Sequence, residues 1–288
     1  MKPRRPAADG VAAVKAGATK GPRRRVGSDA EPRSVAAGAR AAPDGDGSGA
    51  GTGAGNGTDT PAHRSVTSLV RLLHLASPAL PIGGYSYSQA LEWAVERGLV
   101  TDAGSAQRWI GEMLGLAISR GEAPLAWRLL CAAGVDWYRF TTWNAWHRAS
   151  RETAELRAES EQMGHSLAKL MQDLGVLDAD ARRALPGLQP IGLPAAFALA
   201  ARGFGLAPEP ALTAYVWSWL ENQVLAAMKL VPLGQVAGQQ MLAVLGLEIS
   251  SVVHVATTLA DDAISTFAPG LAIASARHES QYSRLFRS

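Results

Sequence analysis

Residues 215–240, YVWSWLENQVLAAMKLVPLGQVAGQQ, form the stretch that decides the fold. Its main apolar residues recur at the spacing of one helix face: Trp217, Leu220, Val224, Met228 and Val231. Other apolar residues cover much of the remaining surface, and a helix that is apolar nearly all round is a buried helix. We therefore expect the central helix of an all-α domain. Pro232 and Gly234 predict a break, and the helix should resume at Gln235.

Four polar residues interrupt this apolar pattern, and their role is open from the residues alone. A buried polar group costs about 1–3 kcal/mol unless it is paired, so such residues are seldom accidental. They serve either the packing of the core or the contact with a partner. The four are Glu221, Lys229, Gln235 and Gln239.

The charge balance of the chain divides at residue 63. The chain has 288 residues, of which 47% are hydrophobic and 18% charged, and this low charge suggests a surface that partners cover. Ten of the 28 Lys and Arg, but six of the 25 Asp and Glu, fall in residues 1–63, which leaves 18 basic and 19 acidic residues. The pI of about 9.2 therefore reflects the N-terminal extension, and the remainder lacks the basic surface that nucleic-acid binding needs.

The compartment follows from three features of the sequence. Cys131 is the single cysteine, which excludes an intrachain disulfide and a cysteine metal site. The first residues lack the apolar core of a secretory signal, and we expect no run long enough to cross a membrane. These features predict a cytoplasmic chain with no membrane contact.

The predicted organisation is an extension followed by one helical bundle. Residues 1–63 are Gly, Ala and Arg-rich and include DGDGSGAGTGAGNG, so we expect disorder there. Residues 64–288 show helical spacing and no useful alternating segment, which predicts a single all-α domain. One long helix over 146–174 is expected, with Arg148 paired to Glu152 and Arg151 to Glu155.

Prolines and glycines predict the local breaks. Residues 78–84 should form a tight loop, followed by a helix that Ser86 and Gln89 cap and that ends at Gly98. Pro124 should lie in the first turn of a later helix.

The residue pattern indicates little catalytic chemistry. The six histidines are not spaced as metal ligands, and no GxxxxGK[ST] motif or Ser-His-Asp grouping is present. Asp261 and Asp262 resemble the magnesium-binding acids of terpenoid synthases, but no further acid follows one turn later. An independent all-α enzyme is therefore a distant alternative, and we expect neither a catalytic site nor a directly bound cofactor.

Three parts of the chain together resemble the urease accessory protein family UreF. They are LLHLASPALPIGGYSYSQALEWAVERG (72–98), RETAELRAESEQMG (151–164), and the pair WLENQVLAAMKLVPLGQ (219–235) with FAPGLAIASARHESQYSRLFRS (267–288). The likeness covers roughly residues 66–288. The sequence departs from the family pattern at Gly84, where a bulkier residue is expected, and at Ala90, where a glycine is expected.

The resemblance implies a dimeric, non-catalytic helical scaffold. Such proteins assemble with UreD (also called UreH) and the GTPase UreG, and this assembly delivers nickel to apo-urease. The resemblance thus places nickel and GTP on partners rather than on this chain. A narrower alternative is a GTPase-activating protein that supplies Arg151 or Arg277 in trans.

Within this resemblance, three surfaces become candidate partner contacts: the polar face of 151–162, the break near 229–239 and the C-terminal tail. Arg and aromatic residues in that tail suit interface hot spots. We expect Pro269 and Gly270 to end a helix and the tail to stay mobile until a partner orders it. The candidate residues are Arg151, Glu152, Glu155, Gln162, Lys229, Gln235, Gln239, Arg277, His278, Tyr282, Arg284 and Phe286.

Overall fold

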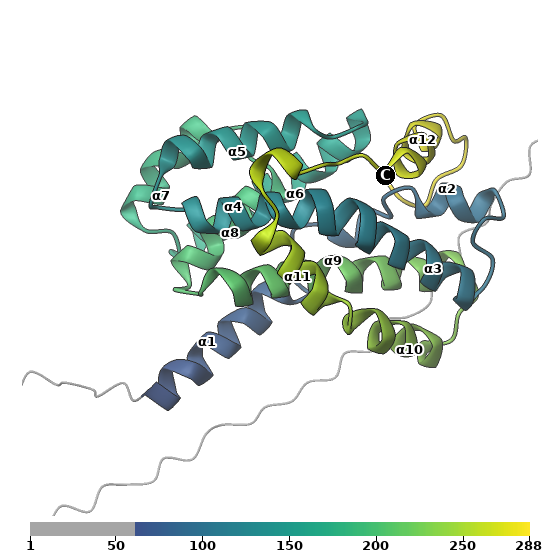
Figure 1. The fold of residues 1–288 in the computed structure, drawn as a ribbon, viewed down its shortest axis with the longest axis horizontal. Coiled ribbons are helices and arrows are strands. Elements are labelled where there is room, and N and C mark those ends of the chain that lie inside the picture. Colours follow the sequence, from purple (N-terminus) through teal and green to yellow (C-terminus); the bar gives the residue numbers. More distant parts are fainter. Residues whose placement is uncertain (1–60) are drawn as a thin grey trace, which may run out of the picture. The chain divides into compact units, whose positions relative to one another are not determined.

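The computed structural model describes residues 61–288, and most of the predicted disordered extension lies outside them. The described residues form helices joined by short loops, with no strand among them, so the all-α prediction is confirmed for this part (Figure 1). The α-helices are α1 (Pro61–Ala76), α2 (Leu91–Glu96), α3 (Ala103–Met113), α4 (Ala123–Ala132), α5 (Trp137–Ala149), α6 (Ala154–Asp173), α7 (Ala179–Ala184), α8 (Leu193–Gly203), α9 (Pro208–Leu230), α10 (Gln235–Gly246), α11 (Ile249–Thr258) and α12 (Pro269–His278). The other helical turns are η1 (Gly84–Ser86), η2 (Leu114–Glu122), η3 (Leu185–Leu188) and η4 (Asp261–Ala263).

Helix α9 is the central helix that the sequence predicts. It ends at Leu230, and α10 begins at Gln235, so the predicted break at Pro232 and Gly234 is confirmed. Its inner face is buried along almost its whole length, at Leu212, Val216, Leu220, Val224 and Ala227. Burial of this face explains why the helix is apolar where an exposed helix would be charged.

Helix α8 is even more deeply enclosed. Every residue from Pro194 to Ala201 is buried, and five of these eight are alanines. Small side chains permit close approach of neighbouring backbones. Gly164 of α6 shows this directly, because a Cβ there would lie 2.4 Å from the carbonyl oxygen of Ile191. The α6–α8 contact therefore depends on a glycine.

Helices α3 and α4 are joined through a π-helical segment, η2, rather than a loop. Pro124 lies in the first turn of α4, as predicted, but the preceding π-helical segment continues into α4 without a break. A proline lacks an N–H and clashes with the carbonyl four residues earlier, here that of Arg120. That carbonyl instead accepts a hydrogen bond from Ser265 N at 2.9 Å. The π-helical segment ends at Glu122, and such segments often occur at functional sites.

The predicted long helix over 146–174 is wrong. The structure ends α5 at Ala149 and starts α6 at Ala154, with Thr153 as N-cap accepting a hydrogen bond from Leu156 N. Because the helix is interrupted, the expected ion pairs do not form. Arg148 pairs with Glu161 and Arg151 with Glu122, each at 2.7 Å.

The predicted cap at Ser86 is also wrong. Helix α2 starts five residues later, at Leu91, and its N-cap Ala90 is left-handed with φ 66°. Gln89 also has positive φ, at 50°. A non-glycine residue in this region costs roughly 1–3 kcal/mol, so the tight turn is strained at a position where the resemblance predicts a glycine. The predicted stop at Gly98 holds, since Gly98 adopts φ 71° just after α2.

One apolar run contradicts the expectation that none is long enough for a membrane. By length and composition alone, residues 235–258 could cross one. The structure divides this run into α10 and α11, which bury Leu242 and Val253 among other residues in the core. Core helices of this kind pass the same test, so the run is weak evidence for a span.

The C-terminal region differs from the predicted mobile tail. Pro269 begins helix α12 instead of releasing the chain, since a proline fits the first turn of a helix. Residues 279–288, here called the C-terminal segment, then pack back onto the bundle. Phe286 is 5% exposed and Ser288 is 1% exposed. Buried side chains and backbone hydrogen bonds hold this segment in place without a partner.

Candidate functional site

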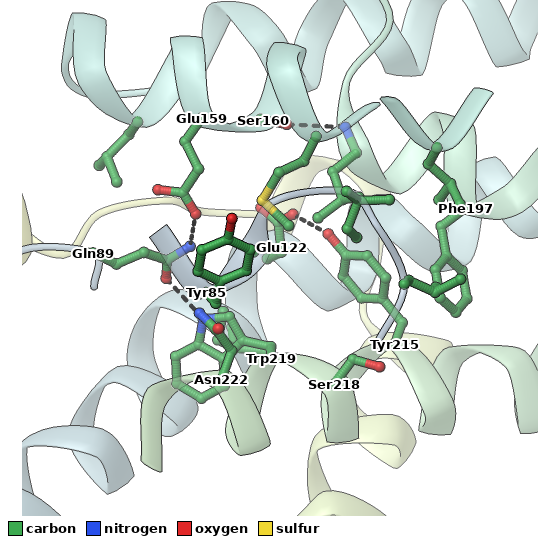
Figure 2. A pocket seen from close by; sticks show the side chains of 18 of the residues that line it. Tyr85, Gln89, Glu122, Glu159, Ser160, Phe197, Tyr215, Ser218, Trp219 and Asn222 are labelled. Atoms are coloured by element: carbon green, nitrogen blue, oxygen red, sulfur yellow. Dashed lines mark hydrogen bonds between the residues drawn. The ribbon is translucent and has the colours of Figure 1, made fainter. Parts of the chain in front are cut away.

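A cavity lies between the loop that follows α1, helix α6 and helix α9 (Figure 2). Its volume is about 200 Å³. Most of its wall is apolar, including Leu75, Met163 and Phe197. Two groups of polar side chains interrupt that wall, one around Glu122 and the other around Glu159. A largely apolar cavity with a few convergent polar groups is the usual form of a binding site.

The first group is centred on Glu122, the last residue of the π-helical segment. Tyr215 of α9 donates its hydroxyl to Glu122 Oε1 at 2.6 Å, and Arg151 Nη1 donates to Oε2 at 2.7 Å. His147 Nε2 lies 3.1 Å from the same Oε2. Helices from three parts of the chain thus meet on one carboxylate. Phe197 of α8 packs edge-on against the Tyr215 ring, which fixes the direction of the hydroxyl.

Burial and charge set the protonation of this group. Burial alone would raise the pKa of Glu122, but the adjacent His147 ring, the Arg151 guanidinium and the hydrogen bond from Tyr215 hold that pKa well below its usual range. Burial lowers the pKa of His147. When the neutral ring carries its proton on Nε2, that nitrogen donates a hydrogen bond to Glu122. Nδ1, which has no hydrogen-bond partner, then carries no hydrogen that would need one. Glu122 is therefore an ionised carboxylate, and both of its oxygens accept hydrogen bonds.

The second group connects α2, α6 and α9 through Gln89. Its amide nitrogen donates to Glu159 Oε1 at 2.8 Å, and its amide oxygen accepts from Trp219 Nε1 at 2.7 Å (Figure 2). The strained turn at Gln89 places both ends of the amide on partners. Burial raises the pKa of Glu159 to about 7, against the lowering effect of its hydrogen bonds from Ser288 and Gln89.

A third set of contacts holds the C-terminal segment beside this cavity. We call Glu92, Glu155 and Glu159 the carboxylate cradle. Glu92 accepts the backbone N–H groups of Leu285 and Phe286, at 2.6 and 2.9 Å. His278 is fully buried between Glu155 (2.7 Å) and Glu92 (3.3 Å). Three carboxylates of α2 and α6 are thereby turned toward α12 and the segment that follows it.

The structure brings half of the predicted site residues together at the docked C-terminal segment. Glu155 binds His278 and Arg284, and Gln162 accepts from Tyr87 and Arg287. The Lys229 ammonium lies over the rings of Tyr85 and Phe286. The residues gathered here are Glu155, Gln162, Lys229, His278, Arg284 and Phe286.

The other predicted site residues lie apart. Arg151 points inward to Glu122, with its side chain 15% exposed, whereas Glu152 is exposed near the groove beside Phe267. Gln235 and Gln239 lie exposed on α10, and Arg277 and Tyr282 are exposed on α12 and after it. The expected single face over 151–162 is therefore divided between the cavity, the C-terminal segment and solvent.

Sequence reasoning missed the residues that make the cavity polar. Tyr215 and Trp219 lie in the predicted central helix, Gln89 in the predicted helix cap and Glu159 in the polar face of 151–162, and Glu122 is not among the predicted site residues. Glu122 carried a usable signal, because it is the acid directly before a proline-containing apolar helix. The others carried none, since only tertiary packing brings them together.

These groups suit binding and structure better than catalysis. Glu122 is saturated by its donors, and Glu159 is held by Gln89 and Ser288. Within residues 61–288, no three His, Cys, Asp or Glu side chains are grouped as metal ligands. Asp261, one of the two acids weighed as a magnesium site, binds Arg128 at 2.9 Å and Arg139 at 3.5 Å.

Comparisons with known proteins agree with the resemblance. The sequence model of the UreF family matches residues 100–246. The urease accessory protein UreF of Azoarcus sp. (strain BH72) is 52% identical over 228 residues, which cover 76% of this chain and 95% of that protein. UreF of Cupriavidus metallidurans is 51% identical over 229 residues, covering 78% and 99%.

A third relative is longer than this chain. The bifunctional urease accessory protein UreEF of Bordetella bronchiseptica is 53% identical over 225 residues, covering 76% of this chain but only 52% of the relative. The matches to the single UreF proteins span nearly their whole length at about half identity. The chain therefore belongs to the UreF family of urease accessory proteins.

Proposed function

We propose that this protein is a non-catalytic scaffold for the insertion of nickel into apo-urease. In this proposal it acts in the cytoplasm, in a complex with UreD (UreH) and the GTPase UreG, and those partners handle nickel and GTP. The observation that carries the proposal is the 52% identity over 228 residues to a urease accessory protein UreF. The UreEF relative adds support, because its name joins two accessory functions in one chain.

The interior of the protein supports a scaffold rather than an enzyme. A general base or nucleophile needs a free lone pair facing a bound substrate. Glu122 instead receives hydrogen bonds from Tyr215 and Arg151 and lies beside His147. These contacts join η2, α5 and α9, and such a network stabilises one arrangement of helices.

The direct test is reconstitution of urease activation. We expect purified apo-urease, UreD, UreG, nickel and GTP to yield active urease only when this chain is added. Pull-down of the chain against UreD and UreG separately would show which partner it contacts. Full activation without the chain, or no capture by either partner, would contradict the proposal.

The surface of α1 supports the expected homodimer. Four apolar residues on one helix face are each more than half exposed: Val66, Leu69, Val70 and Leu73. Figure 1 shows α1 extending from the bundle, with its C-terminal end against α9. Apolar stripes of this kind mark protein contacts. A second copy of α1 would cover the stripe with a matching one, as in a two-fold symmetric interface.

The dimer can be tested at this stripe. Leu69→Glu with Leu73→Glu should convert the protein to a monomer in light scattering after gel filtration. Ser65→Glu, an exposed position of α1 outside the stripe, is the matched control and should stay dimeric. A stripe variant that remains dimeric would place the interface elsewhere.

A narrower second function is activation of GTP hydrolysis by an arginine supplied in trans. The structure favours Arg277 over Arg151 for this role, because Arg277 is exposed and Arg151 is paired with Glu122. Steady-state hydrolysis by UreG should then rise when the chain is added and fall back with Arg277→Ala. An unchanged rate with the variant would leave the scaffold role alone.

A further inference from the structure

The C-terminal segment is held on the bundle by contacts that depend on protons. Ser288 Oγ donates to Glu159 Oε2 at 2.6 Å, and Ser88 N and Oγ both donate to the Ser288 carbonyl. Arg287 N donates to the Ser86 carbonyl at 2.9 Å. Apart from the buried Phe286 ring, the segment is fixed mainly by hydrogen bonds to the loop before α2 and to the carboxylate cradle.

The His278 ring faces a carboxylate at each of its two nitrogens. Nδ1 lies 2.7 Å from Glu155 and Nε2 lies 3.3 Å from Glu92. Each carboxylate oxygen can only accept, so both contacts are hydrogen bonds when the ring carries both protons. A neutral ring would donate to one carboxylate and turn a bare nitrogen toward the other. The ring thus lies between α2 and α6 and holds α12 against both helices.

The charged groups around the cradle come from every element packed against it. Around His278 they are Glu92 of α2, Glu155 of α6 and, through Glu155, Arg284; Glu279 caps the first turn of α6. Around Glu159 the nearby charged and titratable groups are Glu122, Arg151, Tyr87 and Tyr215. Arg287 lies at the rim, on Gln162.

We propose that the C-terminal segment is a strap that is docked on the carboxylate cradle at mildly acidic pH and released from it as the pH rises above neutrality. Release uncovers Glu92, Glu155 and Glu159 and the Phe286 ring, so the two states present different surfaces to a partner. This inference goes beyond the proposed scaffold function and does not depend on which partner binds.

The pH dependence follows from the buried Glu159 carboxyl, which Ser288 of the strap contacts at 2.6 Å. Burial in the docked state raises the pKa of Glu159 from 4.5 to about 7. A group whose pKa is raised in the docked state stabilises docking below its ordinary pKa, and this stabilisation is lost as the pH rises from about 4.5 through about 7. Docking therefore weakens as the pH rises and Glu159 ionises.

A nitroxide spin label on the strap would report its mobility directly. Tyr282 is fully exposed, and Cys131 is the single, exposed cysteine, so Cys131→Ser with Tyr282→Cys gives one labelling site. We expect the mobile fraction of the spectrum to rise at least threefold between pH 5.5 and pH 8. Equal mobile fractions at the two pH values would overturn the proposal.

Two variants distinguish release of the strap from a general loosening of the protein. Glu159→Gln stays neutral at every pH and should keep the mobile fraction at pH 8 below half of the parent value. Glu161→Gln, two residues along α6 and paired with Arg148 instead, should show the parent profile. If the Glu159→Gln profile equals the parent profile, Glu159 does not control the strap and the proposal fails.

Circular dichroism checks that each variant is folded. If Glu159→Gln does not fold, Ser288→Ala replaces it, because it removes the donor to Glu159 without touching the core. That variant should raise the mobile fraction already at pH 5.5, and an unchanged fraction would overturn the proposal. Urease activation is not part of the readout, so failure here is distinct from failure of the scaffold function.

Discussion

Helices α8 and α1 are both strongly apolar, yet their surroundings are opposite. Helix α8 buries every residue from Pro194 to Ala201, whereas α1 leaves Leu69 and Leu73 more than half exposed. Gly164 of α6 allows the backbone just before α8 to approach closely, while α1 presents bulky side chains that nothing in the described chain covers. An apolar pattern thus shows that a face will be covered, but not whether the same chain covers it.

The largest expected effect lies at the α6–α8 contact. Gly164→Ala adds a Cβ that would meet backbone atoms of Ile191 and Gly192 within 2.4–2.8 Å. Backbone cannot move aside as a flexible side chain can, so the loss should exceed the roughly 1–3 kcal/mol of ordinary overpacking. Chemical denaturation measures it. Gly187→Ala, with nothing within 4 Å, is the control and should change stability little. Equal effects of both variants would mean that α6 and α8 are not in close contact.

A matched truncation on the two helices sharpens the comparison. Leu199→Ala in α8 removes a side chain that is 1% exposed and should lower the free energy of unfolding by about 2–5 kcal/mol. Leu73→Ala in α1, at 63% exposure, should change the stability of the monomer by about 0.5 kcal/mol or less. The measurement uses dilute protein, at which any dimer has dissociated. A cost at Leu73 near that at Leu199 would show that α1 packs into the core.

A smaller loss than that at Leu199 is expected at the polar contacts next to α8. Glu122→Gln keeps the shape but removes the charge that Arg151 faces, and should cost about 1–3 kcal/mol at pH 7. The pKa of Glu122 is lowered in the folded state, so its contribution is present above the ordinary pKa of about 4.5 and is lost as the pH falls below it. The variant and the parent should therefore converge in stability toward acid pH. A constant difference from pH 7 to pH 3 would assign the loss to packing.

Much of the fold could be predicted because periodicity and breakers are local. The break between α9 and α10 follows from Pro232 and Gly234, and the all-α class from helical spacing without alternation. The long helix over 146–174 failed for the same reason: its apolar spacing continues through Ser150–Thr153, while the N-cap hydrogen bond of Thr153 ends that continuity. Capping competes with helix propagation, and spacing alone does not decide between them.

The site was much less predictable. Glu122, Gln89 and Trp219 are far apart in the chain, and each looks like an ordinary residue of its own element. The C-terminal segment shows the same limit, because its hydrogen bonds to Glu92 and Ser88 arise only from tertiary structure. The resemblance to a family supplied a function, but it did not say that predicted contact residues such as Glu155 and His278 would bind each other.

The hydrogen bond between Ser88 and Ser288 joins residues that are 200 positions apart. Contacts of such long range form late in folding, because the intervening chain must first be ordered. During synthesis, residues 61–200 can assemble helices while the cavity wall still lacks α9 and the strap. The nascent protein therefore exposes its carboxylates and apolar lining until translation reaches the last residues. For that interval it resembles a substrate of molecular chaperones.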